Sequence, residues 1–241
     1  MKKAGDRQGK YGAQIQLKSI LLLVFLSGCT SMLLPQQLTG SQLNLETKGG
    51  IFSERAYHFA KWSVTDVDRS KLRKTANSGS DFLSTDFNLE KRQQYRFTLH
   101  EATAEKYHVA CAINYSASGV VLGAFTVQRD SLLLTCGFKD PKSGALVGRL
   151  VCQMGRPGLV GNATFGKEEF NVHAEFNSPS MSVIKPPSAY GYVVNRDLSP
   201  IAAIQLTNDR RIWMDKALPT AIASNTAAVL MAMAYYVNLK P

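Results

Sequence analysis

The sequence predicts a mainly β fold: an antiparallel meander that forms a barrel or a sandwich, with one apolar C-terminal α-helix packed on or inside it. From residue 93 onward, short stretches alternate apolar and polar residues, and brief turn-rich segments separate them. The one long helical stretch follows Pro219. Parallel β-α-β units would need crossover connections of a dozen or more residues, and no such helical stretches lie between the predicted strands.

The N-terminus has the pattern of a secretory signal peptide. Basic residues precede an unbroken apolar run at 21–26, which is too short for an ordinary membrane-spanning helix. Small residues follow the run and lead directly to a cysteine. The tetrapeptide Leu26-Ser27-Gly28-Cys29 resembles the lipobox of bacterial lipoprotein precursors. This resemblance implies cleavage between Gly28 and Cys29, and a diacylglyceryl group on Cys29 as the mature N-terminus.

This resemblance divides the chain into three parts. We expect a lipoprotein signal peptide at 1–28, a lipidated tether at 29–40 and a single β-rich periplasmic domain at 41–241, with its helix at 219–238. Thr30 is not the Asp that commonly retains lipoproteins at the inner membrane of Gram-negative bacteria. In such a source the resemblance therefore implies the outer membrane, facing the periplasm. Two or more acyl chains would anchor the chain stably.

The first part of the domain, up to residue 92, has weak periodicity. We expect an early strand or two there, followed by a mobile loop at 70–82. The basic segment 71–74 and the Ser/Gly-rich segment 77–80 are typical of solvated turns.

The β pattern begins at 93–100, where Tyr95, Phe97 and Leu99 fall on one face of a strand. Trp213, near the end of the pattern, is expected in the core or at its edge. Further strands are expected at 107–115, 120–127, 132–138, 146–153, 162–165, 170–176, 190–195, 201–207 and 210–214, with turns that include 118–119, 129–130, 140–144, 155–158 and 166–167, and a proline-containing loop at 177–188.

The C-terminal helix is expected to be buried. Pro219 suits a first helical turn, and residues 227–237 carry no charge, so the helix is apolar all round. A β-meander followed by such a helix is similar to the tubby-like barrels, in which the last helix threads the barrel. That similarity rests on the order of elements and on the apolar composition of residues 219–237, and it implies no functional residues.

Three cysteines remain once Cys29 is assigned to the lipid. Cys111, Cys136 and Cys152 allow at most one internal disulfide in an oxidising compartment, and all three pairings are open. The remaining cysteine is expected to be a buried small hydrophobe. Because no Cys-x-x-Cys or His-x-x-x-His spacing accompanies these residues, we predict neither a metal site nor a cofactor.

Charge and motifs argue against several function classes. The formal net charge is +10, of which residues 1–28 contribute +4 and the mature chain +6, with the charges scattered. Nucleic-acid binding is not predicted, because no basic run is interleaved with aromatic residues.

Ser182-x-x-Lys185 is followed at once by Pro186, which disfavours the helix that such a catalytic pair needs. Glu168 and Glu169 are adjacent and would point to opposite faces of a strand. We therefore assign no catalytic residue.

The predicted function is that of a membrane-anchored, non-enzymatic envelope lipoprotein that binds a protein partner or helps to assemble an envelope complex. One alternative is a lipid- or amphiphile-binding carrier with an apolar cavity in the β domain. The other alternative is a hydrolase of envelope polymers, which would need carboxylates, or a nucleophile and a base, to converge in a cleft.

Overall fold

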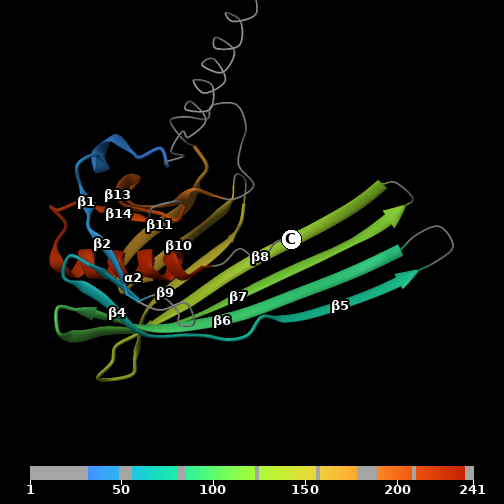
Figure 1. The fold of residues 1–241 in the computed structure, drawn as a ribbon, viewed down its shortest axis with the longest axis horizontal. Coiled ribbons are helices and arrows are strands. Elements are labelled where there is room, and N and C mark those ends of the chain that lie inside the picture. Colours follow the sequence, from blue (N-terminus) through green and yellow to red (C-terminus); the bar gives the residue numbers. More distant parts are fainter. Residues whose placement is uncertain are drawn as a thin grey trace, which may run out of the picture.

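The computed structural model describes residues 32–48, 56–80, 85–122, 125–155, 158–177, 189–207 and 210–236. Within these ranges the chain forms fourteen strands, one short 3-10 helix and one α-helix (Figure 1). The elements are η1 (Gln36–Leu38), β1 (Gln42–Leu43), β2 (Leu45–Lys48), β3 (Ala56–Phe59), β4 (Trp62–Arg69), β5 (Arg73–Ser80), β6 (Thr85–Glu101), β7 (Ala104–Leu122), β8 (Phe125–Lys139), β9 (Leu146–Met154), β10 (Leu159–Phe165), β11 (Glu168–Glu175), β12 (Gly191–Arg196), β13 (Ser199–Gln205), β14 (Arg211–Met214) and α2 (Thr220–Tyr235).

All the strands belong to one antiparallel sheet that curls into a nearly closed barrel. The strand order is β1-β14-β13-β12-β11-β10-β9-β8-β7-β6-β4-β3-β2, and β5 pairs with β6 beside this path. The two ends of the path, β1 and β2, are separated in the chain by Asn44 alone. The first two strands therefore bring the ends of the sheet near each other, and the predicted mainly β meander is confirmed as a nearly closed barrel.

The helix α2 lies inside the barrel, which confirms the predicted buried C-terminal helix (Figure 1). Every residue from 222 to 235 is buried, and Pro219 occupies the N-cap position. Near the end of α2, the ring of Tyr235 packs against the rings of Tyr57 and Phe97, with centroid distances of 5.2 and 5.3 Å. The inward-facing side chains of the strands thus form one core around an apolar helix.

Residues 32–40, the described part of the predicted tether, pack on the outside of the barrel. Met32 and Leu38 are buried against Tyr190 and Trp213 in a small second core. The backbone N–H of Met32 donates a hydrogen bond to Oε1 of Gln205, 2.9 Å away. The sequence-based assignment of Trp213 to the core or its edge agrees with its 7 % exposure.

Two predictions for the middle of the chain are wrong. The expected loop at 70–82 contains β5, which pairs with β6 from Arg73 to Ser80. The expected turns at 118–119 and 129–130 lie inside β7 and β8, which pair with each other up to Leu122 and Phe125. Gly119 serves packing rather than a turn, since a Cβ atom there would lie 2.8 Å from the Phe87 ring.

Within the described ranges, no helix combines the length and the apolar character that a membrane-spanning helix requires.

Candidate interaction surface

Four strands extend far beyond the barrel as a flat ribbon, here called the arm (Figure 1). The arm consists of β5, residues 85–92 of β6, residues 114–122 of β7 and residues 125–132 of β8. In these segments the strands pair with one another, and the described part of β9 joins β8 only from Leu133 onward. Both broad faces of the ribbon therefore extend past the body that buries the rest of the sheet.

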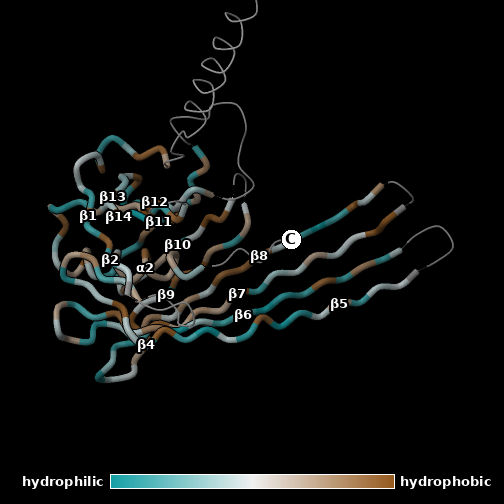
Figure 2. Tube along the Cα trace, viewed as in Figure 1, coloured by the Kyte–Doolittle hydropathy of each residue, from teal (hydrophilic) through white to brown (hydrophobic). Residues whose placement is uncertain are grey.

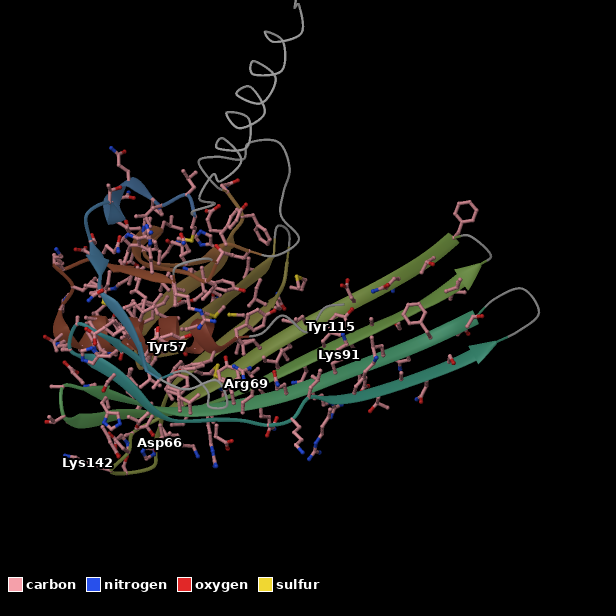
Figure 3. The ribbon with its side chains drawn as sticks, in the orientation of Figure 1. Tyr57, Asp66, Arg69, Lys91, Tyr115 and Lys142 are labelled. Atoms are coloured by element: carbon pink, nitrogen blue, oxygen red, sulfur yellow. A yellow bond between two sulfur atoms is a disulfide. The ribbon has the colours of Figure 1, made fainter. Side chains whose placement is uncertain are left out.

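The inner face of the arm continues the interior surface of the barrel. Tyr115 and Leu132 are buried on this face, and Phe87 and Leu89 are half-buried. The ammonium of Lys91 lies 5.4 Å from the centre of the Tyr115 ring on the neighbouring strand, and Figure 3 labels both residues on the arm. The inner face is thus partly covered by its own side chains.

The outer face of the arm is polar along its middle and apolar at its far end. Ser116 and Ser131 share a hydrogen bond of 2.8 Å between their hydroxyl oxygens across β7 and β8. Phe125 and Val127, at the far end of β8, are 77 % and 64 % exposed. Figure 2 shows the same change of hydropathy along the arm. Uncovered apolar side chains of this size are typical of a contact surface.

A shallow hollow of about 730 Å³ lies on the outer face where the arm meets the barrel, and we call it the basal hollow. Its floor is made by small side chains of β7 and β8: Ala110, Ala112, Thr135 and Gly137. A Cβ atom on Gly137 would lie 3.1 Å from Cδ1 of Leu146. A larger residue at position 137 would therefore displace the leucine that borders the hollow.

Two arginines stand on opposite sides of this floor. Arg96, Ala110, Gly137 and Arg149 occupy one row across β6, β7, β8 and β9. Three strand spacings separate the two arginines, which corresponds to roughly 14 Å. Arg96 forms an ion pair with Asp68 at 3.0 Å. No carboxylate in the described ranges forms an ion pair with Arg149, which is exposed.

The border of the basal hollow is apolar on the side of β9. Leu146 and Val151 line it and are 52 % and 40 % exposed, and Leu133 of β8, two residues before Thr135, is 39 % exposed. Side chains alternate along β8, so Leu133 shares the outer face with Val127 at the far end of the arm. The basal hollow and the apolar end of the arm therefore belong to one continuous face.

The cysteines lie on the inner side of the same region. The structure joins Cys111 of β7 to Cys136 of β8 by a disulfide, and these residues are directly opposite each other at the base of the arm. Cys152 is a free thiol, and burial raises its pKa to about 12. Of the three pairings that the sequence left open, the structure contains Cys111–Cys136. The predicted cleavage and lipidation residues, Gly28 and Cys29, lie outside the described residues.

A polar cluster at the start of α2 anchors the helix. Glu101 accepts hydrogen bonds from Lys61 at 2.6 Å and from Ser224 at 2.7 Å. The Tyr107 hydroxyl donates a hydrogen bond of 2.5 Å to Oδ1 of Asn225. Burial opposes ionisation of Glu101, but the hydrogen bonds from Lys61 and Ser224 outweigh it and hold the pKa below its ordinary value. Ser224 is fully buried, so its hydroxyl is not accessible as a nucleophile.

Other candidate chemical groups remain dispersed. Glu168 forms an ion pair with Arg196 at 3.0 Å, while its neighbour Glu169 is on the opposite face of β11. Within the described ranges, no group of three or more His, Cys, Asp and Glu side chains is arranged to hold a metal ion. The Ser182 and Lys185 match lies outside those ranges. We therefore take the basal hollow with the outer face of the arm as the candidate site among the described residues.

Sequence reasoning missed both Arg96 and Arg149 as site residues. Each is a single exposed arginine within an alternating strand, and the two are 53 positions apart in the printed sequence. Only the strand register places them in one row. No family model, curated protein or solved structure matches the chain.

Proposed function

We propose that this chain is a non-enzymatic, lipid-anchored protein of the bacterial cell envelope that binds a protein partner through its basal hollow and the outer face of its arm. The observation that carries the proposal is the basal hollow itself. Exposed Leu146 and Val151 border a floor of small residues, between two arginines. Anchoring by Cys29 stays part of the proposal and rests on the lipobox resemblance.

The composition of the basal hollow favours a protein as the occupant. Protein interfaces combine an apolar centre with a polar border and are enriched in arginine. The expected partner segment has an apolar side chain over Ala110 and Gly137, and next to it a carboxylate that pairs with Arg149. An arginine binds a carboxylate through two parallel hydrogen bonds, which fixes orientation as well as adding affinity.

The carrier alternative required an apolar cavity within the β domain. In the structure α2 occupies the interior of the barrel, and its residues 222–235 are buried there. A carrier would have to expel this helix, which Glu101 and Tyr107 hold by hydrogen bonds at its first turns. Binding at the outer surface is therefore the better supported function.

The hydrolase alternative required reactive groups that converge in an accessible cleft. Glu101 lies within hydrogen-bond distance of both Lys61 and Ser224, but these polar groups form the helix anchor, and Ser224 is fully buried. These contacts support a structural role for the cluster and favour the non-enzymatic proposal.

Site-specific photocrosslinking in intact envelopes tests the proposal. A photoreactive amino acid at Val151 should give a discrete adduct with one envelope protein. The same amino acid at Leu198, a 90 % exposed position in the β12–β13 turn, is the matched control and should give no such adduct. Adding Arg149→Glu should abolish the Val151 adduct by charge repulsion, whereas Arg149→Lys should weaken it. Identical adducts at both positions, or a Val151 adduct indifferent to Arg149→Glu, would contradict the proposal.

A further inference from the structure

Among the described strands, the arm has two unpaired edges of the same length. On one side, β5 pairs with β6, and no described strand pairs with its other side. On the other side, residues 125–132 of β8 precede the first contact with β9 at Leu133. Each edge thus presents eight residues of strand backbone, and a free edge of this length is a template for pairing with another strand.

The two edges also match in position and direction. Following the pairs across the arm, Ser80 lies in the same row as Thr126, and Arg73 lies in the same row as Leu133. The strand β5 runs toward the far end of the arm, and β8 runs back from it. A β5 strand from a second copy placed beside β8 would therefore be antiparallel to it, with residues 74–80 opposite residues 126–132.

The far parts of both edges, residues 75–80 and 125–128, lack the features that keep natural edge strands apart. Such strands are commonly protected by lysines, prolines or bulges. Residues 75–80 of β5 contain no charge and no proline, and neither do residues 125–128 of β8. Nearer the base the charges are complementary, because Lys74 of the second copy would lie diagonally next to Asp130 of the first. Diagonal cross-strand neighbours are within reach of a lysine side chain.

From these matched edges we propose that copies of this chain associate arm to arm, with β8 of one copy pairing with β5 of the next in a continuous antiparallel sheet. The contact joins two different edges, so each copy retains one further edge for the next copy, and the assembly either closes as a ring or grows. The arm has four strands, so the strands at its two edges, β5 and β8, run in opposite directions. Each contact between copies is therefore antiparallel, like the pairs within one arm. This inference concerns the edges and is independent of the partner proposed for the basal hollow.

Disulfide trapping tests the contact. Asn77 and Arg129 are exposed on the outer face and occupy the same row. Within one copy they are three strands apart, about 14 Å, which is too far for a disulfide. The full-length Asn77→Cys/Arg129→Cys chain, oxidised in membranes, should therefore give covalent dimers and larger multiples. Pairing Asn77→Cys with Val127→Cys or Ser131→Cys covers a stagger of two residues in either direction.

The matched control is Asn88→Cys/Arg129→Cys. Asn88 is equally exposed and in the same row, but it lies on β6, and one strand would always separate it from Arg129 of a neighbouring copy. This control should give no multiples. Multiples of equal yield in the control, or none with any of the three Asn77 pairs, would overturn the inference.

A charge exchange provides a second measurement without added cysteines. Native mass spectrometry of the full-length chain in mild detergent should show multiples that Asp130→Lys weakens by roughly two- to fivefold, the range expected for cross-strand charge pairs. Adding Lys74→Asp should restore them. A strictly monomeric chain, or a double variant weaker than Asp130→Lys alone, would count against arm pairing. If the disulfide multiples form but the photocrosslink at Val151 gives no adduct, only the proposed partner site is contradicted.

Discussion

The guanidinium Nη2 of Arg69 donates a hydrogen bond to the backbone carbonyl of Tyr235, 2.7 Å away and 166 residues along the chain. Tyr95 makes a similar contact, since its hydroxyl donates to the carbonyl of Ala232 at 2.7 Å. The last carbonyls of a helix have no partners within the helix, and its C-terminal end attracts positive charge. Strands β4 and β6 therefore complete the C-terminal end of the buried helix, and Figure 3 places Arg69 at the base of the arm.

Loss of this cap should destabilise the whole barrel. We expect Arg69→Met to lower the free energy of unfolding by about 1–3 kcal/mol, because a buried carbonyl loses a charged donor. Urea denaturation followed by circular dichroism measures the change. Arg96→Met is the matched control, since Arg96 forms an exposed ion pair, and such pairs contribute about 0–1 kcal/mol. Equal losses for the two variants would contradict the capping role.

The disulfide should be found between Cys111 and Cys136, with Cys152 as a thiol. Peptide mapping of the unreduced chain should recover residues 111 and 136 in one linked fragment. Cys152 should react with a maleimide only after unfolding, because the thiol is buried and burial raises its pKa to about 12. A fragment that links Cys152 to either partner would contradict the structure.

Removing the disulfide should lower stability and loosen the arm. The bond closes a loop with a sequence separation of 25 residues, which contains the β7–β8 hairpin of the arm. Loop closure of this size corresponds to about 3–4 kcal/mol in the free energy of unfolding. Cys111→Ala/Cys136→Ala should therefore shift the denaturation midpoint and speed hydrogen exchange at 112–135 more than in the rest of the barrel. Uniform exchange changes would argue against a local role.

The stability of the barrel should fall at acid pH through Glu101. Its pKa in the folded state lies below the ordinary value of 4.5, so its stabilising contribution is complete above that value and is lost as the pH falls through the folded-state pKa. Glu101→Gln should lower stability at neutral pH and flatten the acid limb of the stability curve. If Glu101→Gln left the acid limb unchanged, the loss of stability at acid pH would have to come from other titrating groups.

Membrane attachment should depend on Cys29. The Cys29→Ala chain is expected in the soluble periplasmic or secreted fraction, because α2 is enclosed by the barrel and is not available as an anchor. Cell fractionation with immunodetection measures this release. Cys152→Ala, which removes a buried thiol elsewhere, should remain with the membranes. Retention of Cys29→Ala in the membrane fraction would contradict the lipobox interpretation.

The barrel and its helix could be predicted from local patterns because burial imposes those patterns. Alternation at Tyr95, Phe97 and Leu99 marks strands with one face in the core, and the uncharged stretch after Pro219 marks a helix surrounded by side chains. The arm escaped prediction for the converse reason. Its outer edge, β5, is polar and rich in small residues, and strand pairing rather than burial holds it in place.

The position of the β7–β8 hairpin was predicted wrongly because residues typical of turns lie inside its strands. Ser118-Gly119 and Arg129-Asp130 have the composition of turns, yet they face each other within β7 and β8. The pairing of β7 with β8 continues past these residues as far as Leu122 and Phe125. The basal hollow was beyond sequence reasoning altogether, because Arg96 and Arg149 become neighbours across a floor only once the register of four strands is fixed.

The burial of Met32 determines how the barrel would sit on a bilayer. With Cys29 in the membrane, as proposed, only two residues separate it from Met32, so the lipid attachment point would lie within about 11 Å of the Trp213 side of the barrel. A linker of this length would restrict the rotation of the domain relative to the membrane. The outer surface of β12–β14 would face the headgroups, and the strands of the basal hollow lie about halfway round the sheet from it. A partner would then approach from the aqueous side.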